Sequence, residues 1–173
     1  LYTDDIAFNG LYGILPRQII STEAVERVEV FKGANAFLNG VAPGGSGVGG
    51  AINVVSKRAE DTPNRSIALD YASDSRTGGH VDLGRRFGDD NRFGARVNVA
   101  KRDGETAVDG EHSHFSLATV GLDYRGERLR LSTDFGYQKQ RINEGRSVVY
   151  LAPAGLGGKV PKVPDSDANY SQP

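Results

Sequence analysis

From about Arg65 onward, apolar and polar residues alternate along the chain. Successive side chains of a β-strand point to opposite faces of a sheet, so a period of two predicts strands with one apolar and one polar face. Short polar connectors at residues 74–76, 88–91 and 125–127, and a longer loop at 103–113, predict antiparallel hairpins. The alternation recurs in five runs, at residues 66–71, 80–87, 92–102, 119–124 and 128–138.

The first ~58 residues have a different pattern, in which strand-like runs alternate with Gly-rich turns. Ser21–Glu26 predicts a short helical turn with Ser21 or Thr22 as its cap. Residues 27–32 alternate charged and apolar side chains, which predicts a half-buried strand ending at Gly33. A turn-rich connector at 43–50 precedes a second strand at 51–57. This part of the sequence predicts a small mixed α/β module.

The length of the alternating runs bears on their environment. They reach ~10 residues, which exceeds the usual ~5–6 of soluble strands and suits a tilted membrane strand. Aromatic residues lie near the expected strand ends, as membrane interfaces favour. They are Phe87, Phe93, Tyr124 and Tyr137. A soluble β-sandwich also alternates, so periodicity alone leaves both architectures open.

Composition narrows the function classes. The 173 residues contain no Cys, which excludes disulfides and thiolate metal sites, and a net charge of -1 argues against a nucleic-acid partner. No apolar stretch approaches the ~20 residues of a membrane helix. The sequence contains no Met and stops inside a polar run, so we expect it to be a segment of a longer protein whose signal peptide lies elsewhere.

Four linked elements carry a resemblance to a known family. They are Val25–Gly33 (VERVEVFKG), Ala36–Gly40 (AFLNG), the PGG at Pro43 and Gly49–Arg58 (GGAINVVSKR). In this order and spacing they resemble the plug signature of TonB-dependent outer-membrane receptors, and Asp5–Gly10 resembles a degenerate copy of an upstream plug strand. Asn9-Gly10, Ala34-Asn35 and Ser46–Val48 depart from the family pattern and leave the subfamily open.

The resemblance implies a mainly β fold. Residues 1–60 are expected to be the C-terminal half of a small mixed α/β plug domain. Residues 61–173 are expected to form the first five or so antiparallel strands of a transmembrane β-barrel of about 22 strands, and the start of a long extracellular loop from about Gln140. Connectors 74–76 and 103–113 are then extracellular, whereas 88–91 and 125–127 are periplasmic turns.

The resemblance also implies a function, which is TonB-dependent active import of a ferric siderophore across the bacterial outer membrane. The expected partners are the siderophore, outer-membrane lipid and the TonB protein, whose contact box is absent from this sequence. The iron arrives already chelated, so no cofactor is expected. The siderophore type is favoured because the ending at 43–58, and Val160-Pro161 before Asn169-Tyr170, are most similar to siderophore receptors.

Two sets of residues are predicted to act in this mechanism. Tyr12, Arg17 and Asn39 are the predicted ligand-binding residues, since aromatic and donor side chains at the plug apex suit oxygen-rich iron chelates. Charges of the plug are predicted to pair with arginines of the barrel wall. The plug charges are Glu26, Arg27 and Glu29, and the wall arginines are Arg92, Arg96 and Arg130.

Other chemistries fit the sequence less well. Gly45-x-Gly47-x-x-Gly50 matches a dinucleotide fingerprint, but a strand rather than a helix follows it. His112-Ser113-His114 with Glu111 lacks an evident third fixed ligand, so no metal site is predicted. No nucleophile–base arrangement is recognisable, so the protein is not expected to be an enzyme.

Alternative functions stay open within and beyond this family. Importers of cobalamin, haem or glycans share the plug signature. A soluble β-rich carbohydrate-binding module would fold without detergent and would lack that signature. A passive porin or adhesin would lack the internal plug that residues 25–58 predict.

Overall fold

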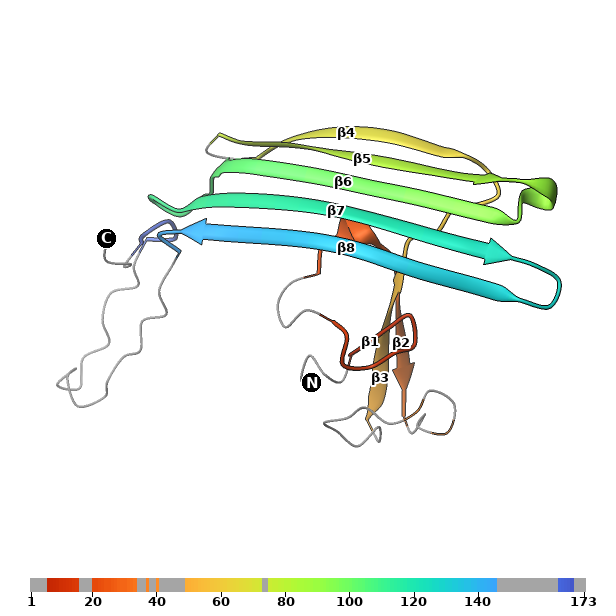
Figure 1. Cartoon of the computed structure of the whole chain (residues 1–173). Coiled ribbons are helices and arrows are strands. Elements are labelled where there is room, and N and C mark those ends of the chain that lie inside the picture. Colours follow the sequence, from red (N-terminus) through yellow and green to blue (C-terminus); the bar gives the residue numbers. More distant parts are fainter. Residues whose placement is uncertain are drawn as a thin grey trace.

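Two β-sheets form the body of the chain (Figure 1). The computed structural model describes residues 6–15, 20–33, 37, 40, 49–72, 75–145 and 165–169. A three-stranded sheet comes from the first part of the chain and a five-stranded sheet from residues 64–143. The fold is mainly β, as the alternating pattern predicts. Within the described residues, no helix is long or apolar enough to span a bilayer.

The larger sheet is an antiparallel meander in which each strand pairs with the next in sequence. Its connections at 106–111 and after 143 lie at one end, and those at 88–92 and 126–129 lie at the other. The strands are 9 to 14 residues long. They are β4 (Asn64–Ala72), β5 (Arg76–Phe87), β6 (Phe93–Glu105), β7 (His112–Arg125) and β8 (Arg130–Asn143).

Two boundaries differ from the sequence predictions. The loop predicted at 103–113 spans only 106–111, because the β6–β7 ladder continues to the pair Glu105–His112. The irregular stretch predicted from Gln140 begins later, because β8 pairs with β7 as far as Asn143. Near residues 103–113 and after Gln140 the side chains no longer alternate between apolar and polar, but the backbone pairing of the strands continues. Asp74 of the first predicted connector lies outside the described residues.

The larger sheet exposes its apolar face and, along β5, β6 and β7, buries its polar face. Leu69 is 88% exposed, whereas Asn98 is 2% exposed. One outward row crosses all five strands through directly paired residues. Its members are Ile67, Val81, Val99, Ala118 and Tyr137. A soluble sandwich would bury such a row, whereas a transmembrane barrel turns it toward lipid and keeps its lumen face polar.

An aromatic row follows the outward face at the short-turn end of the sheet. Phe87 and Phe93 are paired across β5 and β6, with ring centroids 5.8 Å apart, and Phe93 lies 5.0 Å from Tyr124 of β7. Three of the four predicted strand-end aromatics therefore form one belt. The prediction for Tyr137 is wrong, because it lies in the middle of β8, opposite Ala118.

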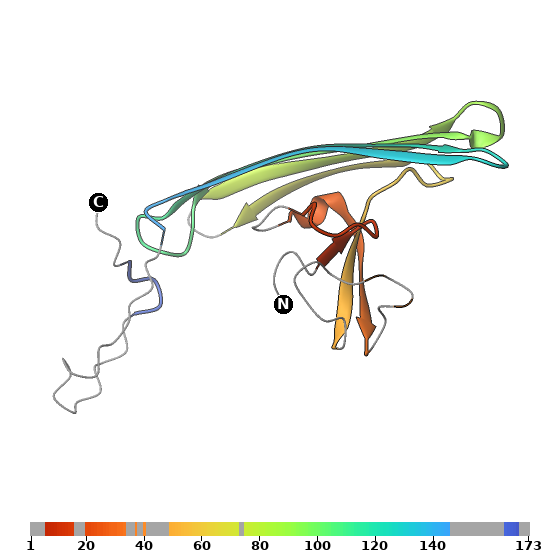
Figure 2. The same ribbon diagram turned by 60° about the horizontal axis from the view of Figure 1, so that its bottom comes forward.

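The smaller sheet stands beneath the concave face of the larger one (Figure 2). Its central strand β3 (Gly50–Ser56) is parallel to β1 (Ile6–Phe8) and antiparallel to β2 (Val25–Lys32). The predicted helical turn is a 3-10 turn, η2 (Thr22–Ala24), with Ser21 at its N-cap. Ser21 makes no side-chain cap, because its hydroxyl donates to the Glu23 carboxylate instead.

Candidate functional site

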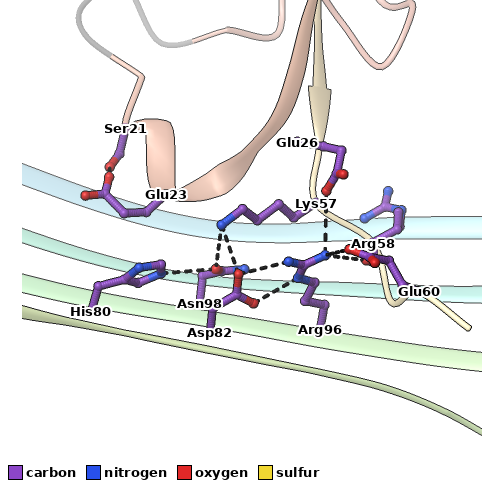
Figure 3. A network of polar contacts seen from close by, with 10 residues as sticks. All are labelled: Ser21, Glu23, Glu26, Lys57, Arg58, Glu60, His80, Asp82, Arg96 and Asn98. Carbon is purple, nitrogen blue, oxygen red and sulfur yellow. Dashed lines mark hydrogen bonds and ion pairs between the residues drawn. The ribbon is translucent and has the colours of Figure 1, made fainter. Parts of the chain in front are cut away.

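The candidate site is the polar interface between the two sheets (Figure 3). β3 ends at Ser56, and residues 57–63 run beneath the larger sheet to reach β4. This path brings the polar ends of β3 and η2 against the polar face of β5 to β8, which is buried along β5, β6 and β7. Charged side chains therefore meet where a soluble domain would place an apolar core.

Asp82 of β5 lies at the centre of this interface. The Arg96 guanidinium of β6 donates two hydrogen bonds to its carboxylate, at 2.8 and 2.9 Å. Lys57 Nζ, from the other sheet, donates to the same carboxylate at 2.9 Å. With its amide nitrogen toward Asp82, Asn98 also donates to that carboxylate at 3.2 Å and to the Glu23 carbonyl at 3.1 Å. One buried anion thus joins a wall cation to a cation from the smaller sheet.

Arg96 also reaches back to the segment beneath it. Its Nη1 donates to the Arg58 carbonyl at 2.9 Å and to Glu60 at 3.1 Å, and it lies 3.5 Å from Glu26. The predicted pairing of Glu26 with a wall arginine is therefore confirmed for Arg96.

The corresponding predictions for Arg27 and Glu29 are wrong. Two positions apart on β2, these residues share a face and pair with each other at 2.8 Å, and Asn53 donates to Glu29 at 2.8 Å. The hydrogen bond from Asn53, with the one from Arg27, lowers the pKa of Glu29 below its usual value. Among the described residues, neither Arg27 nor Glu29 pairs with Arg92 or Arg130, and Arg92 pairs with Asp90 instead.

A second ionic contact joins η2 to β6. Arg102 pairs with Glu23 of η2 and with Asp70 of β4, the latter at 2.7 Å, and its guanidinium lies 5.6 Å from the Phe115 ring centroid. Burial disfavours the ionised Glu23 carboxylate. The hydrogen bonds from Ser21 and Arg102 outweigh that effect and lower the pKa of Glu23 from 4.5 to about 2.

This contact predicts a pH dependence of the interface. A carboxylate whose pKa is lowered in the folded state stabilises that state fully above its unfolded pKa of 4.5, and the stabilisation is lost as the pH falls toward 2. The slope is at most about 1.4 kcal/mol per pH unit. Thermal unfolding of the full-length protein between about pH 6 and pH 3 should therefore show a shallower decline for Glu23→Gln than for the wild type. Equal declines would contradict this role.

Arg86 of β5 fixes the segment that connects the two sheets. Its side chain is 1% exposed and donates to the carbonyls of Ala59 at 3.1 Å and Asn91 at 2.8 Å, and it forms an ion pair with Asp123 at 2.8 Å. A Cβ at Gly94 would lie 2.3 Å from Asp123 Oδ1 and 2.6 Å from Arg86 Nη1. The missing side chain at Gly94 therefore makes room for this ion pair.

The N-terminal half of β8 closes the interface on its other side. Arg58 pairs with Asp134, and Asp134 also accepts hydrogen bonds from Asn9 and from Ser56, both at 3.0 Å. Asn9 reaches this position because it and Gly10 adopt the left-handed conformation of a tight turn, with φ of 50° and 83°. Asn9 thus provides an amide donor to Asp134 of β8.

Of the three predicted ligand-binding residues, the structure describes only Tyr12. Tyr12 is half-buried in a bend after β1 and lines a cavity of ≈ 230 Å³ with Glu29, Phe31 and Asn53. Its neighbours there belong to the smaller sheet. Arg17 and Asn39 lie outside the described residues. Ligand binding by these three residues stays a prediction.

Several interface residues were not singled out from the sequence. Asp82 and Asn98 are polar residues of alternating strands. The alternation shows which face of the sheet they occupy but does not show their partners. The interface partners lie far away in sequence, 25 positions for Lys57–Asp82, 78 for Ser56–Asp134 and 125 for Asn9–Asp134. The additional residues are Asn9, Glu23, Ser56, Lys57, Arg86, Arg102 and Asp134.

The smaller sheet is docked by charged groups against the polar face of a sheet that has long strands and an apolar outer face. This is the plug-and-barrel arrangement of TonB-dependent outer-membrane receptors. Comparisons with known proteins confirm the resemblance to receptors of the ferric-siderophore type. Over 169 residues, 98% of this chain, the sequence is 54% identical to the ferrichrome receptor FcuA of Yersinia enterocolitica. The crystal structure of BauA, the ferric preacinetobactin receptor of Acinetobacter baumannii, matches 98% of the chain with a TM-score of 0.87 and 40% identity.

A more distant structure supports the fold. The siderophore receptor PiuA of Acinetobacter baumannii covers 97% of this chain with a TM-score of 0.76 and 23% identity, and this chain covers 24% of PiuA. No protein-family model matches. The chain spans 22% of the length of FcuA and 25% of that of BauA. Both relatives are receptors, in agreement with the expectation that this is not an enzyme.

Proposed function

We propose that the protein containing this chain imports a ferric siderophore across the bacterial outer membrane. The observation that carries the proposal is the interface itself: a plug-like sheet is held in a polar lumen by hydrogen-bonded ion pairs around Asp82 and Arg96. Ion pairs of this kind hold a domain in place without an apolar core, so water can replace them when the domain moves. The named ligands of FcuA and BauA, ferrichrome and ferric preacinetobactin, support a siderophore as the cargo.

The proposal assigns a role to each sheet. Residues 1–60 are the C-terminal half of the plug, and residues 61–173 begin the barrel wall and one long extracellular loop. The connections at 106–111 and after Asn143 then face the outside, and the turns at 88–92 and 126–129 face the periplasm. The short-turn end carries the aromatic belt, as expected for the inner interface of an outer-membrane barrel.

Energy for import is proposed to come from the TonB protein, which acts on the plug. The cost of loosening the plug is set largely by the contacts described above, because they join η2, β3 and residues 57–60 to the wall. Iron enters as part of the cargo, so no resident cofactor takes part.

Binding of a panel of ferric chelates tests this proposal. The full-length protein in detergent is titrated with ferrichrome, ferric preacinetobactin and other ferric siderophores, and with cobalamin, haem and an oligosaccharide. Quenching of intrinsic fluorescence reports binding. We expect tight binding of a ferric siderophore. If cobalamin, haem or the oligosaccharide bound instead, the protein would still be interpreted as an importer, but a ferric siderophore as its cargo would be contradicted.

The predicted ligand residues are tested in the same titration. Tyr12→Ala and Arg17→Ala are each expected to weaken binding of the ferric chelate by about tenfold, the effect of losing ~1.4 kcal/mol of contact. Tyr12→Phe keeps the ring and serves as the matched control for its hydroxyl. Unchanged affinity in both Ala variants would leave the function in place and remove these residues from the site.

A further inference from the structure

Two histidines and an aspartate gather on the outward face of the larger sheet, away from the interface with the plug. Asp103 of β6 is paired in register with His114 of β7, and His112 lies two positions from His114 on the same face. One ligand atom from each of these three residues lies within 4.8 Å of the other two. The histidine and carboxylate atoms therefore converge on one point.

The distances suit a metal ion. His112 Nε2 lies 3.3 Å from Asp103 Oδ1, His114 Nδ1 contacts Asp103 Oδ2, and the two imidazole rings are 4.4 Å apart. Bonds of about 2.0–2.2 Å to a tetrahedral ion place its ligand atoms roughly 3.3–3.6 Å apart. Small side-chain rotations at His114 would bring all three atoms to that spacing.

We propose that Asp103, His112 and His114 form a binding site for a divalent transition-metal ion of the Zn²⁺ class. Imidazole nitrogens favour Zn²⁺, Cu²⁺ and Ni²⁺, whereas Mg²⁺ and Ca²⁺ prefer oxygen ligands, so the donor set selects the former. Three protein ligands leave at least one coordination position for water or an anionic group. This inference does not depend on the proposed import function.

The pairing of β6 with β7 supplies a third ligand, Asp103, that is not evident from the sequence. Glu111 is the acidic residue next to the two histidines in the sequence, but in the structure it accepts a hydrogen bond from Thr106 at 2.8 Å. Asp103 precedes the histidines by nine and eleven positions, and the antiparallel register carries it across to His114. The ligands thus come from two neighbouring strands, which fixes their backbones.

The site lies beyond the apolar band of the sheet. Asp103 is four positions past Val99 of the outward apolar row, toward the loop end of β6, and its side chain is 51% exposed. In register, Glu105 faces His112 and Arg141 faces His114. The carboxylate of Glu105 favours a bound cation and Arg141 opposes it. Ions in the surrounding water can reach this position.

Zinc titration of the full-length protein, purified without a histidine tag, tests the site. Competition with a chromophoric chelator measures Zn²⁺ affinity and stoichiometry, and the d–d absorption of Co²⁺ reports nitrogen and oxygen coordination. We expect Asp103→Asn and His114→Ala each to lose one bound Zn²⁺, or at least about tenfold in its affinity, and to lose the matching Co²⁺ absorption.

Asp90→Asn is the matched control. Asp90 is an exposed carboxylate at the opposite end of the sheet, and its left-handed φ of 54° suits Asn. We expect this variant to bind Zn²⁺ as the wild type does. Zinc stoichiometry and affinity that are the same in the wild type, Asp103→Asn and His114→Ala would overturn the proposal, and so would the absence of Zn²⁺ binding to the wild type.

Discussion

Replacing Asp82 with Asn is expected to destabilise the seated plug by roughly 3 kcal/mol, the lower end of the cost of breaking a buried ion pair. The substitution keeps the shape of the side chain and removes the charge that Arg96 and Lys57 share. Two cations are then left facing each other in a site that is largely closed to water. Arg96 keeps Glu60 and Glu26 at the rim, which limits the loss. Calorimetry of the full-length protein should show the plug transition about 6–12 °C lower.

Asp90→Asn is the control for this substitution as well. Asp90 pairs with Arg92 at 3.0 Å, but its side chain is 79% exposed, so the expected loss is below about 1 kcal/mol. Lys57→Met should be strongly non-additive with Asp82→Asn, because the two residues form one contact between the sheets. Equal effects of the Asp82 and Asp90 substitutions would contradict the interface described above.

Val99→Arg is expected to cost about 2–4 kcal/mol of stability in lipid, the penalty for an arginine near the middle of a bilayer. Val99 lies in the outward row that crosses all five strands, between the aromatic belt and the loop end. In a soluble protein the same exposed position would tolerate arginine at little cost. Urea titration of the full-length protein refolded into lipid vesicles measures the difference.

Glu127→Arg is the matched comparison for the lipid-facing position. Glu127 is exposed in the turn between β7 and β8, where the barrel meets the interface, and arginine there costs only about 0–1 kcal/mol. If Val99→Arg were no more costly than Glu127→Arg, the outward face would not contact lipid.

The alternation of apolar and polar residues is sufficient to predict the strands, because it indicates directly which face of the sheet each residue occupies. The inverted burial of Leu69 and Asn98 follows from that pattern once the membrane is taken into account. Strand ends were less predictable. Backbone hydrogen bonds extend β6 and β7 to Glu105 and His112, where the polarity of the side chains no longer alternates.

The contacts between the sheets were mostly not predictable from the sequence. The sequence predicts the pairing of Glu26 with Arg96, because the two residues carry opposite charges and belong to the two different modules. The sequence predicts a partner on the barrel wall for Arg27, whereas Arg27 forms an ion pair with Glu29 on its own strand. Lys57–Asp82 and Asn9–Asp134 depend on how the smaller sheet is oriented, and no single strand pattern contains that information.

The chemistry of the interface fits the proposed role of the smaller sheet as part of a plug that is seated and then released. Its links are ion pairs and hydrogen bonds from side chains to carbonyls, as in Arg96 to Arg58 and Arg86 to Ala59. Water can satisfy each of these groups when the sheets separate, which lowers the cost of movement relative to an apolar core.

Energised uptake of a ferric siderophore tests the central claim most directly. Cells lacking their own siderophore receptors are supplied with the full-length protein, and entry of radiolabelled iron is followed with ferrichrome and the other chelates of the binding panel. The account predicts uptake of a ferric siderophore that stops when the proton gradient is collapsed. Uptake that continues without the gradient, or a protein that never carries a ferric chelate inward, would contradict it.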